Sequence, residues 1–256
     1  MQILLSCAKT MTEKSKVKVP RVTQPLYKEN ASIIALHMSQ RSVSELEELL
    51  KVNAKIALEN QQRYQVFHSP DTPELPALLA YTGIVFKRID PKSFTEEDFQ
   101  SAQSHLRITS FGYGLLRPLD VIRNYRLEGT VRLEEMSDSS LFDYWKDRLT
   151  NNFIKDIKSD GGILCNLASN EMKQLFNWAE VEKQVRIITP EFKVWKDGKL
   201  KTVVVYAKMC RGEMTRYIIK NRITDPRHLK EFDWDGFMYD EALSEGDNWV
   251  FVSNQK

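Results

Sequence analysis

One predicted β-hairpin constrains the fold of this 256-residue chain more than any other feature. Two runs rich in β-branched residues, 184–195 and 200–207, flank the tetrapeptide Lys-Asp-Gly-Lys at 196–199. Asp-Gly between two such runs is typical of a two-residue turn, because that turn needs positive φ at its central positions. The chain must therefore contain at least one antiparallel pair of strands.

Short apolar runs and amphipathic stretches alternate along the rest of the chain. Runs of strand length occupy residues 2–6, 83–87, 163–167 and 249–252, and we predict β-strands there. Apolar residues at helical spacing, introduced by serines with a glutamate three residues later, predict helices over 42–64 and 93–107. Further helices are predicted over 72–80, from Pro118 onward, over 141–160 and over 212–222.

Interleaved strands and helices favour parallel strands, whereas the hairpin requires an antiparallel pair. No internal repeat, low-complexity tract or linker divides the sequence. We therefore predict one mixed α/β domain over residues 1–256, built on a mixed sheet rather than on a regular doubly wound one.

Composition excludes several classes of protein. The 37 basic and 35 acidic residues give a net charge of only +2, so a nucleic-acid site must arise from basic residues gathered on one face. Three scattered cysteines and four histidines show no disulfide or metal-ligand spacing, and we expect neither metal nor cofactor. No run of eighteen apolar residues and no secretory leader occur, so we expect a cytoplasmic protein without a membrane partner.

Charge is segregated near the C-terminus. Residues 201–230 hold eight basic and two acidic residues, and residues 231–247 hold seven acidic residues and no basic one. This pattern fits either a positive binding surface or a solvated helix face that the acidic tail neutralises. Lys208 and Arg211 are three residues apart and can share a helical face, and Gly212 lets a ligand or a backbone segment approach closely.

Residues 111–114, Phe-Gly-Tyr-Gly, have the apolar-Gly-apolar-Gly pattern of helix-hairpin-helix DNA-binding modules. In such modules the glycines expose backbone N–H groups that can hold a phosphate. The alternative is a plain turn between two helices.

Polar residues also follow two predicted strands. Lys9 and Thr10 follow the first strand, and residues 166–171 (Asn-Leu-Ala-Ser-Asn-Glu) close the strand at 163–167. Ligands in α/β sheets bind at the carboxyl ends of strands, so both groups could meet in one cleft. Ser169 could instead cap a helix. Cys7 beside Lys9 is either a buried, inert thiol or one whose pKa a nearby cation lowers.

Several strings together resemble the YaaA family of bacterial peroxide-stress proteins. They lie in the family's order over most of the chain, at residues 3–10, 94–107, 113–120 (Tyr-Gly-Leu-Leu-Arg-Pro-Leu-Asp), 125–128 (Tyr-Arg-Leu-Glu), 166–171 and 206–216. Two positions depart from the family's pattern. Cys7 replaces a proline, which affects the loop before Lys9, and Gly129 replaces a methionine.

The resemblance implies a mixed α/β fold peculiar to the family, with a helix-hairpin-helix element beside a basic cleft. It also implies double-stranded DNA as the partner and a role in limiting iron-driven DNA damage. Carried over to this sequence, Phe111, Gly112, Tyr113 and Gly114 form the hairpin, and the phosphate contacts are Lys9, Arg117, Arg126, Lys208, Arg211 and Arg216. Such contacts would supply affinity with little base readout.

The alternative is an enzyme that acts on a nucleotide or a phosphorylated small molecule in the same cleft. The family strings contain groups able to transfer protons or grip anions, although no catalytic motif assigns their roles. The candidates are Asp120, Glu128, Ser169, Glu171 and Lys208. Direct iron storage is disfavoured, because no carboxylate-histidine spacing of the di-iron type occurs.

Overall fold

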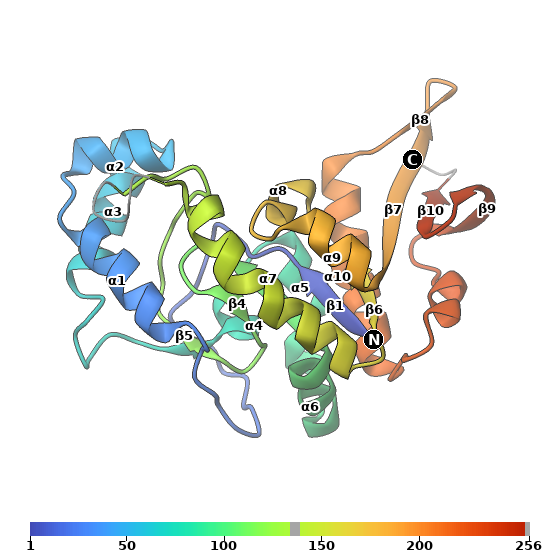
Figure 1. Cartoon of the computed structure of the whole chain (residues 1–256), viewed down its shortest axis with the longest axis horizontal. Helices are drawn as coiled ribbons and strands as arrows, with labels where there is room; N and C mark the ends of the chain where they lie inside the picture. The colour runs from blue at the N-terminus through green and yellow to red at the C-terminus, as the bar shows by residue number, and fades with distance from the viewer. Residues whose placement is uncertain (134–138, 254–256) are drawn as a thin grey trace.

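The computed structural model describes residues 1–133 and 139–253, and Figure 1 shows their arrangement around a central sheet. That sheet has eight strands, in the order β4-β3-β1-β6-β7-β10-β9, with β8 paired to β7. Its strands are β1 (Gln2–Leu5), β3 (Leu106–Ser110), β4 (Gly114–Leu116), β6 (Ile163–Asn166), β7 (Arg186–Lys196), β8 (Lys199–Lys201), β9 (Met238–Glu245) and β10 (Asn248–Ser253). A separate pair joins β2 (Leu75–Pro76) to β5 (Val121–Ile122).

The sheet is mixed, as the sequence predicts. β3, β1, β6, β7 and β10 run parallel, whereas β4, β8 and β9 are antiparallel to their neighbours. The predicted hairpin turn is confirmed: β7 and β8 flank the Asp-Gly turn, and both turn residues have positive φ. Its second arm is shorter than predicted, because β8 ends at Lys201 and residues 204–207 begin α10. The mixed α/β class is therefore confirmed.

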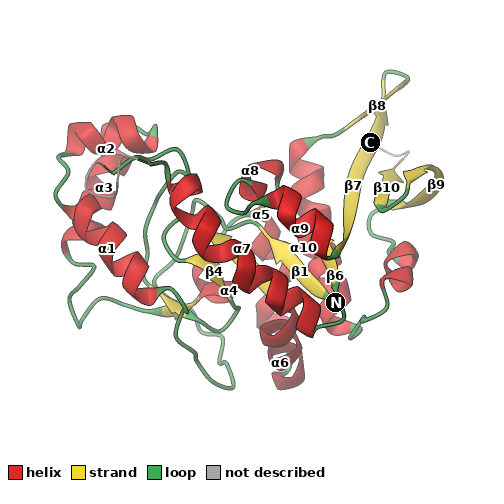
Figure 2. Ribbon diagram, in the orientation of Figure 1, coloured by secondary structure: helices red, strands yellow, loops and turns green. Residues whose placement is uncertain are grey.

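Helices cover both faces of the sheet (Figure 2). α7 and α9 lie in front of β1 and β6 in that view, and α5, α6 and α10 lie behind, while α1, α2 and α3 gather at one end of the molecule. The helices are α1 (Lys28–Ser39), α2 (Val43–Leu50), α3 (Ala54–Gln65), α4 (Ala77–Ala80), α5 (Ile84–Ile89), α6 (Glu96–His105), α7 (Leu141–Ser159), α8 (Asn170–Lys173), α9 (Trp178–Gln184) and α10 (Val204–Lys220). Short 3-10 helices occupy Pro91–Ser93 and Pro226–Glu231. No helix of the described ranges combines the length and apolar content needed to cross a lipid bilayer.

Several predicted elements are wrong. The helix predicted over 42–64 is two helices, because Lys51 adopts a left-handed conformation and Asn53 caps α3. Residues 84–89 form α5 and not a strand, since their β-branched residues pack as a helix against α10. The predicted helix from Pro118 is a turn that leads into β5, and the helix predicted over 72–80 is β2 followed by α4.

The helix-hairpin-helix prediction is also wrong. Residues 111–113 link β3 to the antiparallel strand β4, which begins at Gly114, so two strands and not two helices flank the turn. The predicted helix over 93–107 ends at His105, and the β-branched residues that follow it form β3. The turn packs on α7, where Trp145 Nε1 donates to the carbonyl oxygen of Phe111 at 2.8 Å.

Two glycines permit close packing in this fold. A Cβ on Gly212 of α10 would lie 2.4 Å from the carbonyl oxygen of Val85 in α5, so it is a backbone segment that approaches this glycine. A Cβ on Gly129 would lie 2.2 Å from the Phe142 ring, so the absent side chain makes room for that ring. Gly129 is thus a packing position.

Candidate functional site

A cavity of about 410 Å³ lies where the parallel strands β1 and β6 end. Leu4 pairs with Asn166 at the end of this ladder, so the segments that follow the two strands come together. The loop after β1 and the segment from Leu167 to α8 line the cavity, and α5, α10 and residues 125–127 complete its walls. Lys9 and Thr10 therefore share one cavity with Ser169 and Glu171, as the strand-end argument predicts.

Lys9 makes the shortest ion pair at this cavity. Its Nζ lies 2.7 Å from Oε2 of Glu128, and the two side chains are 55% and 9% exposed. Nη2 of Arg126 lies 3.9 Å from the other carboxylate oxygen, Oε1, which accepts no hydrogen bond. Glu128 therefore lies behind the cavity wall and holds Lys9 and Arg126 beside each other.

Lys208 and Arg211 enter the cavity from one face of α10. Lys208 is exposed, and within the described chain neither residue forms an ion pair. Nε of Arg211 is buried without a hydrogen-bond partner, and so is Nε of Arg126. Burial lowers the pKa of Arg211, although a guanidinium stays charged at neutral pH. Over residues 1–133 and 139–253, both buried N–H groups therefore lack an acceptor.

The deeper wall of the cavity is aromatic. Phe111, Tyr125 and Phe86 line it and are almost fully buried. The Tyr125 hydroxyl lies 2.7 Å from the Tyr81 hydroxyl and 2.7 Å from the Ser110 hydroxyl. Burial raises the pKa of Tyr125 well above its ordinary value, so this hydroxyl stays protonated.

The loop after β1 contains Ser6 and Cys7. Ser6 Oγ accepts a hydrogen bond from the Ser169 backbone N–H at 2.9 Å, which ties this loop to the start of α8. Ser169 is the N-cap residue of α8, but its side chain accepts no capping hydrogen bond. Burial, with the nearby Glu171 and Glu128 carboxylates, raises the pKa of Cys7 to about 12. The nearby cation therefore does not lower the pKa of this half-buried thiol, which stays protonated at neutral pH.

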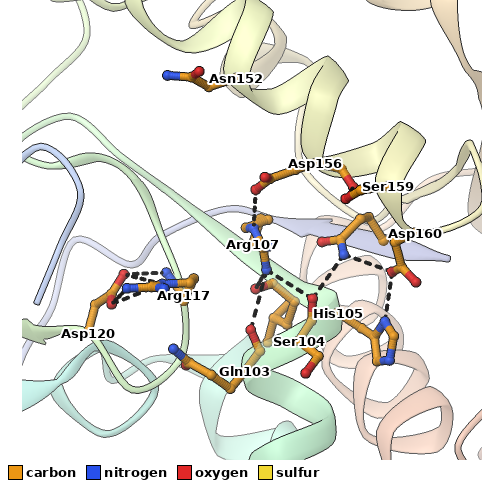
Figure 3. Close-up of polar contacts among 12 residues, drawn as sticks. Gln103, Ser104, His105, Arg107, Arg117, Asp120, Asn152, Asp156, Ser159 and Asp160 are labelled. Atoms are coloured by element: carbon orange, nitrogen blue, oxygen red, sulfur yellow. Dashed lines mark hydrogen bonds and ion pairs between the residues drawn. The ribbon is translucent and has the colours of Figure 1, made fainter. Parts of the chain in front are cut away.

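Arg117 and Asp120 lie outside the cavity, and Figure 3 shows them facing each other. Arg117 Nη2 lies 2.8 Å from Oδ1 of Asp120, whose side chain is 1% exposed. Asp120 also accepts from the Arg117 backbone N–H and from the Thr23 hydroxyl. Both side chains therefore hold the turn before β5 in place.

Arg216 likewise lies outside the cavity. Its Nη1 donates to the carbonyl oxygens of Ile89 and Asp90 at 3.1 and 3.3 Å, and it reaches the Ser93 hydroxyl. It also forms an ion pair with Asp90 at 3.5 Å. Arg216 therefore fastens α10 to the end of α5.

The four residues of the predicted hairpin are buried, and of these only Phe111 lines the cavity. The acidic tail over 231–247 contributes no residue to the cavity lining, so it does not neutralise Lys208 and Arg211 there. Among the described residues, no group of three or more His, Cys, Asp or Glu is placed to hold a metal ion.

Sequence reasoning missed Ser6 and the wall that α5 provides. The position of Ser6 directly after β1 could have indicated it, because ligands in α/β sheets bind at the carboxyl ends of strands. The contribution of α5 gave no such indication, since Ile84 and Val85 have the composition of a strand.

The chain matches known proteins over almost its whole length. A family model described as "Peroxide stress protein YaaA" matches residues 1–243. A UPF0246 protein of Bacteroides thetaiotaomicron is 65% identical, with 99% of this chain and 98% of that protein covered. Those of Porphyromonas gingivalis and Teredinibacter turnerae are 44% and 39% identical, covering 98% and 100% of this chain and 99% and 100% of their own.

Proposed function

The chain belongs to the peroxide stress protein YaaA family, and from that premise we propose that it binds DNA phosphates through the cationic cavity in the response to peroxide. The family supports the role in the oxidative stress response. The proposal adds double-stranded DNA as the partner and the cavity mouth as the contact.

One observation carries the proposal. Among the residues that the structure describes, Lys208 and Arg211 lie at the cavity without a carboxylate partner, and buried N–H groups of Arg126 and Arg211 lack acceptors. A guanidinium left without a counter-charge favours an anion, and its fork of donors matches the oxygens of a phosphate. An array of such groups therefore suits a polyanion.

The contact set is smaller than the family resemblance implies. Lys9, Arg126, Lys208 and Arg211 line the cavity, whereas Arg117 and Arg216 are engaged in structural contacts elsewhere. The turn over 111–114 supplies no phosphate contact in this proposal, because its side chains are buried. Basic side chains on phosphates release the cations condensed on DNA, and in this proposal that release limits iron-driven damage.

The proposal is tested by fluorescence anisotropy with a fully paired, labelled duplex. The wild type binds it, Lys208→Ala weakens binding about fivefold to tenfold at 0.1 M salt, and Lys199→Ala has little effect. Lys199 is an exposed lysine of β8 outside the cavity, so this variant makes the same charge change elsewhere. Absence of duplex binding by the wild type would overturn the proposal, and equal losses in both variants would remove the cavity from it.

A second candidate function is an enzyme acting on a nucleotide or a phosphorylated small molecule. The observation favouring it is the buried Glu128 carboxylate, which holds Lys9 and keeps Oε1 free of hydrogen bonds. A carboxylate beside an ammonium group can move a proton as well as balance charge. Incubation with nucleotides, followed by chromatography, would reveal a product that Glu128→Gln fails to form.

A further inference from the structure

The inner wall of the cavity suits a planar ring. Phe111 and Tyr125 line the cavity and are 2% and 6% exposed. The Tyr125 hydroxyl is already hydrogen-bonded to the hydroxyls of Tyr81 and Ser110, so an occupant need not form a hydrogen bond with it. A flat, apolar ring face is therefore the complementary group at this depth.

The polar groups of the cavity favour a second kind of ligand group, an anion that accepts hydrogen bonds. Nε of Arg126 and Nε of Arg211 are buried N–H groups without acceptors in the described part of the chain, and an unpaired buried donor costs free energy. A phosphate offers several oxygens to such donors, and Lys208 adds a further positive charge at the same cavity.

The size of the cavity limits what can enter. A volume of about 410 Å³ lies within the range of small-molecule sites, which is about 300–1,000 Å³. It is too small for a double helix, whose major groove alone is about 12 Å wide. A duplex can therefore touch the mouth of the cavity, but only a small part of a nucleic acid can fill it.

We propose that the cavity takes one nucleotide unit, with its phosphate at Arg126, Lys208 and Arg211 and its base against Phe111 and Tyr125. The inference rests on the proposed DNA binding and names the part of DNA that fills the cavity. A free nucleoside monophosphate and an unpaired nucleotide turned out of a duplex offer the same chemistry. Turning a nucleotide out of the duplex costs the least free energy when that nucleotide has no pairing partner.

The first test is calorimetric titration with dAMP, deoxyadenosine and inorganic phosphate. The wild type binds dAMP about tenfold or more tightly than either fragment, because base and phosphate contacts are made together. Arg211→Gln weakens dAMP binding about tenfold, and Ala8→Phe and Ile84→Trp, which fill the cavity from two sides, abolish it. Thermal unfolding identifies a variant that fails to fold. In that case the other filling variant shows whether dAMP binds in the cavity.

The second test compares a paired duplex with the same duplex carrying one unpaired adenosine. The unpaired nucleotide raises affinity about tenfold, the gain expected from stacking one base, and the filling variants bring the ratio toward one. If both duplexes bind equally and dAMP does not bind, the inference is overturned while DNA binding stands. If dAMP binds and neither duplex does, the nucleotide site is supported and the proposed DNA binding fails. Binding of dAMP that survives both filling variants places the nucleotide elsewhere and overturns the inference.

Discussion

Lys9 Nζ lies 2.7 Å from Oε2 of Glu128, and this ion pair joins the loop after β1 to a segment 119 residues further along the chain. The carboxylate is buried, whereas the ammonium group is half exposed at the cavity. Glu128 therefore has two opposing effects on an incoming anion: it positions Lys9, and its negative charge opposes the approach of a phosphate.

Substitution Glu128→Gln separates these two effects. Glutamine keeps an oxygen acceptor for Lys9 and removes the negative charge, so affinity for duplex DNA rises several-fold at low salt. The gain shrinks as salt screens the charges. Anisotropy titrations at several salt concentrations measure it. Weaker binding by the variant at every salt concentration would show that the charge of Glu128 is needed to position Lys9.

Arg216 stabilises the fold, and its removal leaves DNA binding in place. Arg216→Ala deletes the donors to the carbonyl oxygens of Ile89 and Asp90 that fasten α10 to α5, which costs about 1–3 kcal/mol in the free energy of unfolding. Urea denaturation measures that loss, and anisotropy shows duplex affinity equal to that of the wild type. The opposite pattern, lost affinity at unchanged stability, would return Arg216 to the DNA contacts.

Gly212→Ala destabilises the protein. Alanine in place of glycine within an unhindered helix stabilises by about 1 kcal/mol. Here the added Cβ would meet the carbonyl oxygen of Val85 at 2.4 Å, so α10 and α5 must separate, at a cost of about 1–3 kcal/mol. Because these helices form cavity walls, nucleotide binding weakens as well. A higher midpoint of urea unfolding than in the wild type would contradict this packing.

The ion pairs of Asp98 make the free energy of unfolding depend on pH in the acidic range. Burial alone would raise the pKa of Asp98, but hydrogen bonds from Lys220, the Thr95 backbone and Arg222 outweigh it and hold the pKa at about 2. A carboxyl whose pKa is lower in the folded than in the unfolded chain stabilises the fold above its unfolded pKa. That contribution, about 2 kcal/mol, is lost as pH falls from about 4 to about 2.

The variant Asp98→Asn tests this dependence. It is less stable than the wild type by urea denaturation at pH 7, and the difference narrows as pH falls through this window. Asp71→Asn is the control, because Asp71 is exposed and forms no ion pair within the described ranges. An equal difference at pH 7 and pH 2 would show that the ion pairs of Asp98 do not account for the loss.

The sequence predicts the mixed sheet because its evidence is local. The Asp-Gly turn and the apolar runs at 2–6, 163–167 and 249–252 carry their own periodicity and turn chemistry. The same reliance on local evidence makes the prediction for residues 84–89 wrong. Their β-branched composition favours a strand, but they form a helix that packs against α10. β9 escapes detection because its side chains are mostly exposed.

The candidate site is predictable only in part. Lys9, Arg126, Lys208 and Arg211 meet at one cavity, and they follow from strand ends, helix spacing and the family strings. Arg117 and Arg216 belong to the same strings but form structural contacts, and composition cannot tell a free guanidinium from one with a partner. The burial of residues 111–114 depends on β4 and α7, which their short pattern does not encode.

The most direct test of the account is the salt dependence of duplex binding by the wild type and by the Lys208→Ala/Arg211→Ala double variant. Each basic group on a phosphate contributes about −0.9 to the slope of log affinity against log salt. We predict that the double variant binds more weakly and that its slope is shallower by about two units. An unchanged slope in a folded double variant would contradict the claim that these two side chains hold DNA phosphates.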